Sequence, residues 1–326
     1  MQCDMETLPF RLSGRDIILD DIVTNNYVSI NNEDFYAGLL DINFKRNKGA
    51  HSFVFALYDA QSYDENAIPV YALKISNAHD ELIDGNVVVS WPNKAFYSEI
   101  ECLKKCNANS ARNVVSLICD GKFLYHRDPD EQRKRKEINK VFPYYVMEYA
   151  DCDLKKFMEG NRDKLTYEQK VGFCLQLAQG LNDLSKMGYY HRDLKPDNIF
   201  IFGDSWKIGD LGMVATREMD NYDGNTTIIG PKGWLSPEPM NKYLTHGVID
   251  GIDCSIDTSS DIFQLGKIFW YIMQGNVPIG VIHRKDFKDS HMAMYKIIMH
   301  MIQYDKNKRA LNLEKDVINK LENILK

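Results

Sequence analysis

The chain has 326 residues, of which 44% are hydrophobic and 26% are charged, the usual proportions of a globular protein. This length allows one large domain or two lobes with a substantial core. The formal net charge of −6 argues against a nucleic-acid partner, because such proteins usually present a basic surface.

The sequence shows no sign of export or of membrane insertion. Its N-terminus is polar and acidic, unlike a signal peptide. No apolar run approaches the roughly 18–20 residues that a membrane span needs. The seven cysteines are scattered and include no CxxC pair, so we expect buried free thiols in a reducing compartment. We therefore expect a cytoplasmic protein, in its own cell or in a host cell.

The first part of the chain is mainly strand-like. Residues 1–37 show no periodicity that predicts an element and are treated as an N-terminal extension of unclear role. Apolar and aromatic runs predict strands, and one segment at 93–106 has the spacing of a helix. The strands are expected at 53–58, 70–75, 114–118 and 144–147. The charged stretch 128–140 is expected to be a solvated loop, with a targeting or docking element as the alternative.

The part of the chain after Asp151 is mainly helical. Apolar residues at i, i+3, i+4 and i+7 predict helices at 167–188, 259–274, 292–304 and 312–325, and a short strand is expected at 206–208. A strand-rich part followed by a helical part favours an α+β protein with two lobes.

The octapeptide HRDLKPDN at 191–198 is the most informative motif. Asp193 can accept a proton from a hydroxyl group, and the side-chain oxygen of Asn198 can hold a metal ion. Lys195 can neutralise the charge of a phosphate in transfer. The motif therefore indicates phosphoryl transfer.

This octapeptide resembles the catalytic loop of the protein kinases, in the form typical of Ser/Thr kinases. The resemblance extends over about 42–325. It implies a bilobal protein-kinase fold, with a β-rich N-lobe and hinge at 38–150 and a larger helical C-lobe at 151–326. It also implies that Asp193 is the catalytic base, with Lys195 and Asn198 as further catalytic residues.

Three more residues resemble the family's nucleotide and metal site. Asp210 begins the triplet DLG, which resembles the metal-binding DFG motif, so Asn198 and Asp210 are expected to bind Mg²⁺, with Mn²⁺ as an alternative. Lys74, in YALKI, resembles the lysine that contacts the ATP phosphates. Its expected counter-ion is Glu99, in EIECL, with Glu101 as the fallback.

The remaining nucleotide contacts are expected from the glycine loop, the hinge and the adenine pocket. Aligned on Val54, the glycine loop becomes NKGAHSFV, which keeps only Gly49, with the small Ser52 nearby. The resemblance implies that Met147 is the gatekeeper, that the backbone of 148–150 binds adenine, and that apolar side chains sandwich the ring. The predicted contacts in this set are Gly49, Ser52, Val54, Ala72, Met147, Glu148, Ala150 and Phe200.

Three positions are expected to be structural. Glu238, in SPE, resembles the carboxylate of the family's APE motif and is expected to pair with Arg309. Asp261 resembles the aspartate that anchors the backbone of the catalytic loop.

Control of activity is expected from the activation segment, which lies between the DLG triplet at 210–212 and the SPE triplet at 236–238. Arg192 resembles the arginine that pairs with a phosphorylated residue, and Thr226 and Thr227 are the candidate phosphorylation sites. Pro231 stands where Ser/Thr kinases have a threonine, and proline offers neither a hydroxyl nor an N–H.

The resemblance therefore implies a kinase that transfers the γ-phosphoryl group of ATP to Ser or Thr of a protein substrate. Two alternatives remain: a pseudokinase scaffold that binds ATP structurally, and a small-molecule phosphotransferase of the same fold. The sequence makes no prediction about oligomeric state.

Overall fold

The chain divides into two compact units in a computed structural model. The first comprises 1–104 and 116–149, and the second 105–115 and 150–326. The structure describes residues 6–13, 16–40, 51–125, 139–216, 228–247, 251–288 and 291–326. Residues 41–50, which include the first half of the expected glycine loop at 47–54, lie outside the described residues, as do most of the charged stretch and the segment 217–227. Gly49, Thr226 and Thr227 are therefore not described.

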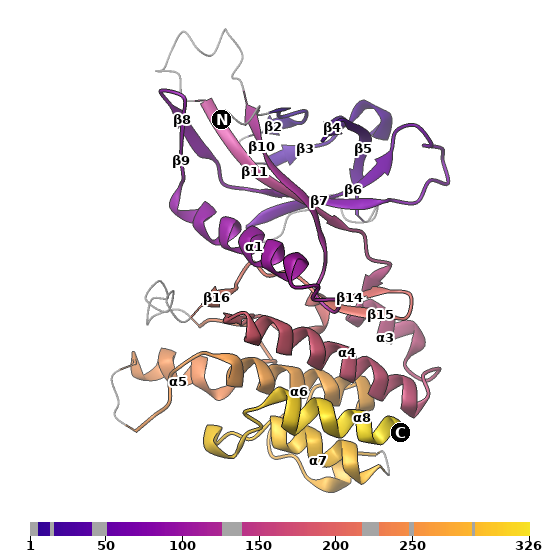
Figure 1. The fold of residues 1–326 in the computed structure, drawn as a ribbon, viewed down its shortest axis with the longest axis vertical. Coiled ribbons are helices and arrows are strands. Elements are labelled where there is room, and N and C mark those ends of the chain that lie inside the picture. Colours follow the sequence, from indigo (N-terminus) through magenta and orange to yellow (C-terminus); the bar gives the residue numbers. More distant parts are fainter. Residues whose placement is uncertain are drawn as a thin grey trace. The chain divides into compact units, whose positions relative to one another are not determined.

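The first unit is built on one curled sheet (Figure 1). The strands are ordered β1-β10-β11-β7-β6-β5-β4, and β8 pairs with both β11 and β9. All these pairs are antiparallel except β1 with β10. The strands of this sheet are β1 Glu6–Thr7, β4 Tyr27–Ile30, β5 Glu33–Leu39, β6 Ser52–Asp59, β7 Tyr71–Ser76, β8 Asp80–Ile83, β9 Asn86–Val88, β10 Leu117–Tyr125 and β11 Asn139–Glu148. Strands β2 Arg11–Ser13 and β3 Asp16–Ile18 form a separate hairpin.

Residues 6–39 supply five strands, although the sequence predicted no element there. These strands are short, and only the seven residues of β5 are long enough to show a period. The turn between β4 and β5 consists of Asn31 and Asn32, both with positive φ, as two-residue hairpins require. Phe10, Val28 and Phe35 are buried in the core of this sheet, so the segment is part of the first unit.

The strand predicted at 114–118 begins later, at Leu117. The backbone of 113–115 instead bonds to Ile208: Asn113 O accepts the N–H of Ile208 at 2.9 Å, and the N–H of Val115 donates to Ile208 O at 2.9 Å. The helix predicted at 93–106 is confirmed as α1, Trp91–Ala108.

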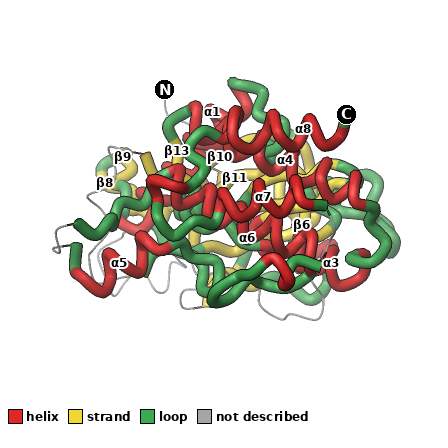
Figure 2. The backbone as a smooth tube through the Cα atoms, turned by 90° about the horizontal axis from the view of Figure 1, so that it is seen from below, coloured by secondary structure: helices red, strands yellow, loops and turns green. Residues whose placement is uncertain are grey.

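The second unit is mainly helical (Figure 2). Its helices are α3 Leu154–Asn161, α4 Tyr167–Lys186, α5 Pro237–Thr245, α6 Thr258–Gln274, α7 Met292–Met301 and α8 Asn319–Leu325. The predicted helices at 167–188, 259–274, 292–304 and 312–325 are confirmed as α4, α6, α7 and a π-turn at Glu314–Ile318 that continues into α8. The α+β class is therefore confirmed.

Helix α6 forms the centre of this unit. Fourteen of its residues are buried, and it packs against both α4 and α7. Asp257 and Ser260 form a capping box at its start, and Gly275 ends it in the left-handed conformation. A buried, doubly capped helix is a rigid support for the loops that contact it.

Short strands carry the loop at 191–198. They are β12 Cys152–Asp153, β13 Tyr189–Tyr190, β14 Ile199–Phe202, β15 Ser205–Ile208 and β16 Ala215–Thr216. The octapeptide lies between β13 and β14. Among the described residues, no helix is long and apolar enough to cross a membrane.

Candidate active site

Lys74 and Glu99 form a buried ion pair in the first unit. Lys74 Nζ lies 2.8 Å from Glu99 Oε1 and 3.0 Å from Oε2, and the two residues are 6% and 1% exposed. The hydroxyl of Tyr145 donates to the same Oε1 at 2.9 Å. Strand pairing accounts for this arrangement, because Tyr145 of β11 is the register partner of Lys74 of β7.

The apolar residues predicted for adenine lie on the same strands. Ala72 pairs with Met147, and Val54 of β6 pairs with Lys74. Ser52, at the start of β6, is buried opposite Ser76. The side chain of Glu148 accepts the N–H of Ser116 at 2.7 Å, and the N–H of Glu148 donates to Ser116 O at 3.2 Å.

In the second unit, Asp193 is held through one of its two carboxylate oxygens. Its Oδ2 accepts from Lys195 Nζ at 2.8 Å and from Asn198 Nδ2 at 2.8 Å. No described residue donates to Oδ1, and the Asp193 side chain keeps 15% of its surface exposed. The carboxylate is thus fixed in direction and still has one oxygen that can accept a proton.

Asn198 and Asp210 stand at the same end of a hairpin. Ile199 of β14 pairs with Ile208 of β15, and one step further the N–H of Gly209 donates to Asn198 O at 2.9 Å. Asp210 follows Gly209 directly, with an exposed side chain and a φ of 50°. Backbone pairing therefore sets the two predicted metal ligands close to each other.

The donor atoms in this hairpin fit Mg²⁺. The side-chain amide nitrogen of Asn198 donates to Asp193 O and Oδ2, each at 2.8 Å, which leaves the amide oxygen as the atom for a metal. Among the described residues, no group of three or more His, Cys, Asp or Glu could hold a metal. Mg²⁺ commonly binds through one or two carboxylates plus phosphate oxygens and water, so two protein oxygens fit an ion that arrives with a nucleotide.

His191 connects the loop to the Asp210 segment. Its Nδ1 accepts the N–H of Asp193 at 3.2 Å, so its Nε2 carries the hydrogen and donates to Gly209 O at 3.0 Å. The ring is fully buried, and this burial lowers the pKa of His191. A neutral imidazole therefore joins the two motifs.

Asp261 of α6 anchors the backbone of the loop. Its Oδ2 accepts the N–H of His191 at 2.7 Å and its Oδ1 that of Arg192 at 2.8 Å. Burial raises the pKa of Asp261 to about 7, against the opposing effect of these two N–H groups. Gln264, one turn further along α6, accepts the N–H of Leu194 at 2.9 Å.

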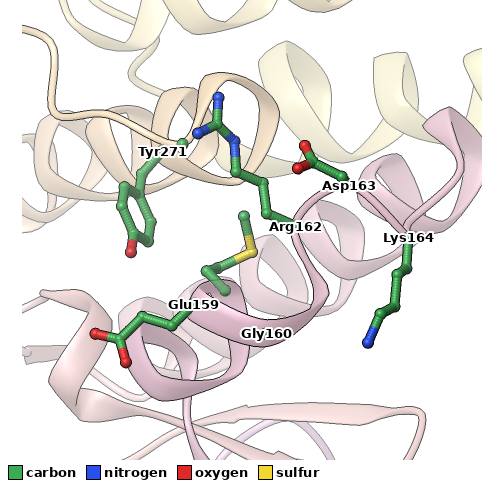
Figure 3. A pocket seen from close by; sticks show the side chains of 8 residues that line it. Glu159, Gly160, Arg162, Asp163, Lys164 and Tyr271 are labelled. Atoms are coloured by element: carbon green, nitrogen blue, oxygen red, sulfur yellow. The ribbon is translucent and has the colours of Figure 1, made fainter.

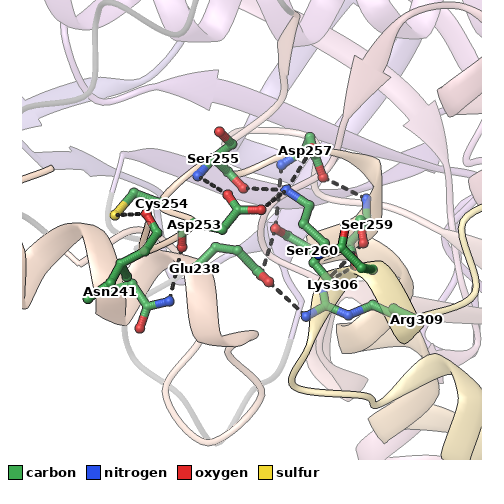
Figure 4. Close-up of polar contacts among 12 residues, drawn as sticks. Glu238, Asn241, Asp253, Cys254, Ser255, Asp257, Ser259, Ser260, Lys306 and Arg309 are labelled. Carbon is green, nitrogen blue, oxygen red and sulfur yellow. Dashed lines mark hydrogen bonds and ion pairs between the residues drawn. The ribbon is translucent and has the colours of Figure 1, made fainter. Parts of the chain in front are cut away.

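Glu238 and Arg309 form a second buried pair in this unit (Figure 4). Arg309 Nη2 lies 2.7 Å from Glu238 Oε1, with side chains 0% and 2% exposed. The guanidinium also donates to Ser259 O at 2.8 Å and to Gln303 O at 2.9 Å, and Ser260 Oγ donates to Glu238 Oε2 at 3.0 Å. The pair is therefore well supplied with hydrogen bonds.

Comparison with known proteins identifies the family. A model described as "Protein kinase domain" matches residues 48–326. The chain belongs to the protein kinase family. The kinase fold expected from the sequence, α+β and bilobal, is confirmed.

Curated kinases from distant organisms are similar to the chain. It is 28% identical over 182 residues to cyclin-dependent kinase F-4 of Oryza sativa, a match that covers 56% of the chain and 35% of the rice protein. It is 28% identical over 199 residues to a probable serine/threonine-protein kinase of Clostridium acetobutylicum, with 56% and 28% covered. It is 27% identical over 228 residues to mitogen-activated protein kinase 4a of Physcomitrium patens, with 69% and 50% covered. The kinase chain thus matches only half or less of each of these relatives.

The described residues that line a cavity of ≈ 430 Å³ in the second unit of this kinase include none of the predicted site residues. It is lined from α3, from the residues that follow α3 and from the end of α6, including Glu159, Arg162, Asp163 and Tyr271 (Figure 3). Arg162 Nη2 donates to Gln274 O at 2.6 Å. Burial first, and then nearby carboxylates, raise the pKa of Tyr271.

The sequence motifs did not predict two residues that shape this kinase site, Tyr145 and Gln264, or the ring contacts of His191. The role of Tyr145 depends on the register between β7 and β11, which spacing along one strand does not reveal. Gln264 lies within the segment D-x-x-x-x-G at 261–266, and one turn of helix separates it from Asp261. That spacing could have indicated a second contact with the loop.

Proposed function

We propose that the chain is an active protein kinase that transfers the γ-phosphoryl group of ATP to Ser or Thr hydroxyls of protein substrates. The observation that carries this proposal is the environment of Asp193. Lys195 and Asn198 hold its Oδ2, and no described residue donates to its Oδ1. A carboxylate arranged in this way can orient a hydroxyl and accept its proton.

The transfer step uses the residues of the loop as follows. The acceptor oxygen attacks the γ-phosphorus while its proton moves to Oδ1 of Asp193. The bond between the γ-phosphorus and the bridging oxygen breaks, and ADP leaves with that oxygen. Lys195, at 2.8 Å from Asp193 Oδ2, stabilises the negative charge of the group in transfer.

Two other sets of residues bind the nucleotide in this proposal. Lys74, kept in place by Glu99, contacts the α- and β-phosphates. Val54, Ala72, Met147 and Phe200, with the backbone of 148–150, bind the adenine. Asn198 and Asp210 hold Mg²⁺, which supplies positive charge to the phosphate oxygens when it is bound.

Specificity for Ser and Thr is supported by Lys195 and by the relative from Clostridium acetobutylicum that is named a probable serine/threonine-protein kinase. The presence of Glu238, paired with Arg309, supports a protein substrate over a small molecule.

Arg192 is proposed to pair with phosphorylated Thr226 or Thr227, although in this structure its Nε donates to Met213 O at 2.7 Å. We propose residence in the cytoplasm, supported by six free cysteines among the described residues.

A scaffold that binds ATP without transferring phosphate is the second candidate. Pro231 favours it, because this buried residue offers neither hydroxyl nor N–H where a threonine would. The two candidates differ in turnover and agree in nucleotide binding.

The experiment measures transfer of ³²P from γ-labelled ATP with Mg²⁺ to generic protein substrates, followed by phosphoamino-acid analysis. We expect phosphoserine or phosphothreonine from the unaltered chain, no transfer by Asp193→Ala or Lys74→Met, and retained ATP binding by Asp193→Ala. Asp204→Ala, at an exposed turn of the same unit, is the matched control and should transfer normally.

Each alternative predicts a different outcome. ATP binding without transfer by the unaltered chain would favour the scaffold. Labelling of a small alcohol such as choline, and of no protein, would favour the small-molecule enzyme. Undiminished transfer by Asp193→Ala would show that Asp193 is not the base.

A further inference from the structure

A buried polar cluster at the start of α1 lies outside every motif that identifies the family. Its centre is Asp80, the first residue of β8, which is fully buried. Asp80 Oδ1 accepts from the N–H of Ser90 at 2.8 Å and from Asn93 Nδ2 at 2.7 Å, and its Oδ2 accepts from the hydroxyl of Tyr97 at 2.6 Å. The Oδ1 of Asn93 in turn accepts from Ser76 Oγ at 2.6 Å.

These bonds hold one carboxylate against the first two turns of a helix. No ion pair of Asp80 is found among the described residues, so its charge is balanced by N–H and O–H groups and by the positive end of α1. If α1 moved away, Asp80 would remain buried without its donors, which is costly for a carboxylate. Asp80 therefore resists displacement of the N-terminal part of α1.

Strand β7 and helix α1, which the hydrogen bond from Ser76 to Asn93 joins, also carry the Lys74–Glu99 pair. Glu99 lies on α1, about 9 Å along the helix axis from Asn93. Lys74 lies on β7, about 7 Å along the strand from Ser76. The cluster is thus a second connection between β7 and α1, and it is built entirely within the first unit.

We propose that Asp80 is a positioning residue for the Lys74–Glu99 pair. It acts through Ser90, Asn93 and Tyr97, which keep α1 in the place where Glu99 meets Lys74. The effect on catalysis rests on the proposed kinase activity, whereas the effect on α1 does not.

The test compares Asp80→Ala, Asp80→Asn and Tyr97→Phe in the full chain. Two quantities are measured: hydrogen exchange of the amides in 91–100, and kcat and KM for ATP. Asp64→Ala is the matched control, because it removes an exposed carboxylate from a loop of the same unit.

We expect Asp80→Ala to speed exchange in 91–100 by about tenfold or more, with exchange in β10 and β11 unchanged. Its kcat should fall by between about 10- and 100-fold, since a misplacement of about 1 Å can cost that much. Tyr97→Phe should show both effects to a smaller extent. Asp80→Asn should recover much of the loss, because its amide can accept from Ser90 and donate to the Tyr97 oxygen.

The proposal is overturned if Asp80→Ala folds and leaves both exchange in 91–100 and kcat at the values of Asp64→Ala. If Asp80→Ala does not fold, Tyr97→Phe decides: unchanged exchange in 91–100 overturns the proposal, and faster exchange supports it. If the unaltered chain transfers no phosphate, the proposed function fails while the exchange measurement still tests the position of α1.

Discussion

The carboxylate of Asp261 accepts the backbone N–H of Arg192 at 2.8 Å, and Arg192 has a φ of 67°. A residue with a long side chain rarely adopts this left-handed conformation, which costs of order 1–3 kcal/mol. Space around the Arg192 carbonyl is also limited, because a Cβ on Gly230 would lie 3.0 Å from Arg192 O. Helix α6 therefore holds the loop in a conformation that the loop would not adopt alone.

Asp261→Asn should impair both stability and phosphoryl transfer. Asparagine offers one acceptor oxygen, so one of the two N–H groups of His191 and Arg192 would lose its partner and face an amide donor. We expect a loss of about 1–3 kcal/mol in the free energy of unfolding and a fall in kcat of about tenfold or more. Urea unfolding and steady-state kinetics would measure these effects, with Asp204→Asn as control. Normal kcat in a folded Asp261→Asn enzyme would contradict the anchoring role.

The pH dependence of stability should differ between the unaltered chain and Asp261→Asn. The raised pKa of Asp261, about 7, means that the folded state binds a proton which the unfolded state lacks, so stability falls as pH rises from about 4 to 7. The lowered pKa of His191 acts oppositely: the unfolded state gains a proton below about pH 6.5, so stability falls as pH falls.

In the unaltered chain the two effects offset each other near pH 6, whereas Asp261→Asn keeps only that of His191. The variant should therefore lose stability on acidification below about pH 6.5, by up to about 1.4 kcal/mol per pH unit, and the unaltered chain should lose less. Urea midpoints between pH 5 and 8 would measure the difference. Parallel pH profiles for the two proteins would show that Asp261 does not titrate in this range.

Local motifs predicted most of the site residues, because the spacing within a loop or turn is itself the structural information. The octapeptide and the DLG triplet are of this kind, and so is the periodicity of α4 and α6. Tyr145 was not predicted because its contact with Glu99 depends on the register of β11 with β7. Asp80 was not predicted because its donors lie at the start of α1, a different element. Of the five strands before Leu40, β1 to β4 have two to four residues each and are too short to show a period, and the burial of β5 does not alternate along its whole length.

Tyr145→Phe should weaken catalysis without unfolding the sheet. It removes the hydroxyl that donates to Glu99 Oε1 and leaves the Lys74–Glu99 pair, so we expect a loss of about 0.5–1.5 kcal/mol in stability and a moderate fall in kcat/KM for ATP. Tyr144→Phe is the control, because Tyr144 points to the other face of β11 and stacks on Phe123. Equal kinetics of the two variants would mean that the Tyr145 hydroxyl does not steady Glu99.

Gly209→Ala should displace Asp210. A Cβ at this position would lie 2.4 Å from two ring atoms of Phe200 and 2.9 Å from Val115, so the ring or the strand end must move. We expect a stability loss of about 1–3 kcal/mol and a higher KM for ATP. Adding Phe200→Leu should relieve the clash, recover part of the lost stability and lower the KM for ATP again. Gly172→Ala, on α4 where a Cβ would meet nothing within 4 Å, is the control, and it should unfold at the same urea concentration as the unaltered chain or a higher one.

The Glu238–Arg309 pair should be costly to break from one side. Glu238→Ala leaves the fully buried Arg309 without its counter-ion, and breaking a buried pair in this way typically costs about 3–5 kcal/mol. The double variant Glu238→Leu/Arg309→Met removes both charges and should therefore be more stable than Glu238→Ala alone. The exposed pair Lys186–Glu314, at 2.9 Å, is the control, and Glu314→Gln should barely change the urea midpoint because solvent screens that pair. If Glu238→Ala and Glu314→Gln shifted the midpoint equally, burial would not be what makes the Glu238–Arg309 pair important.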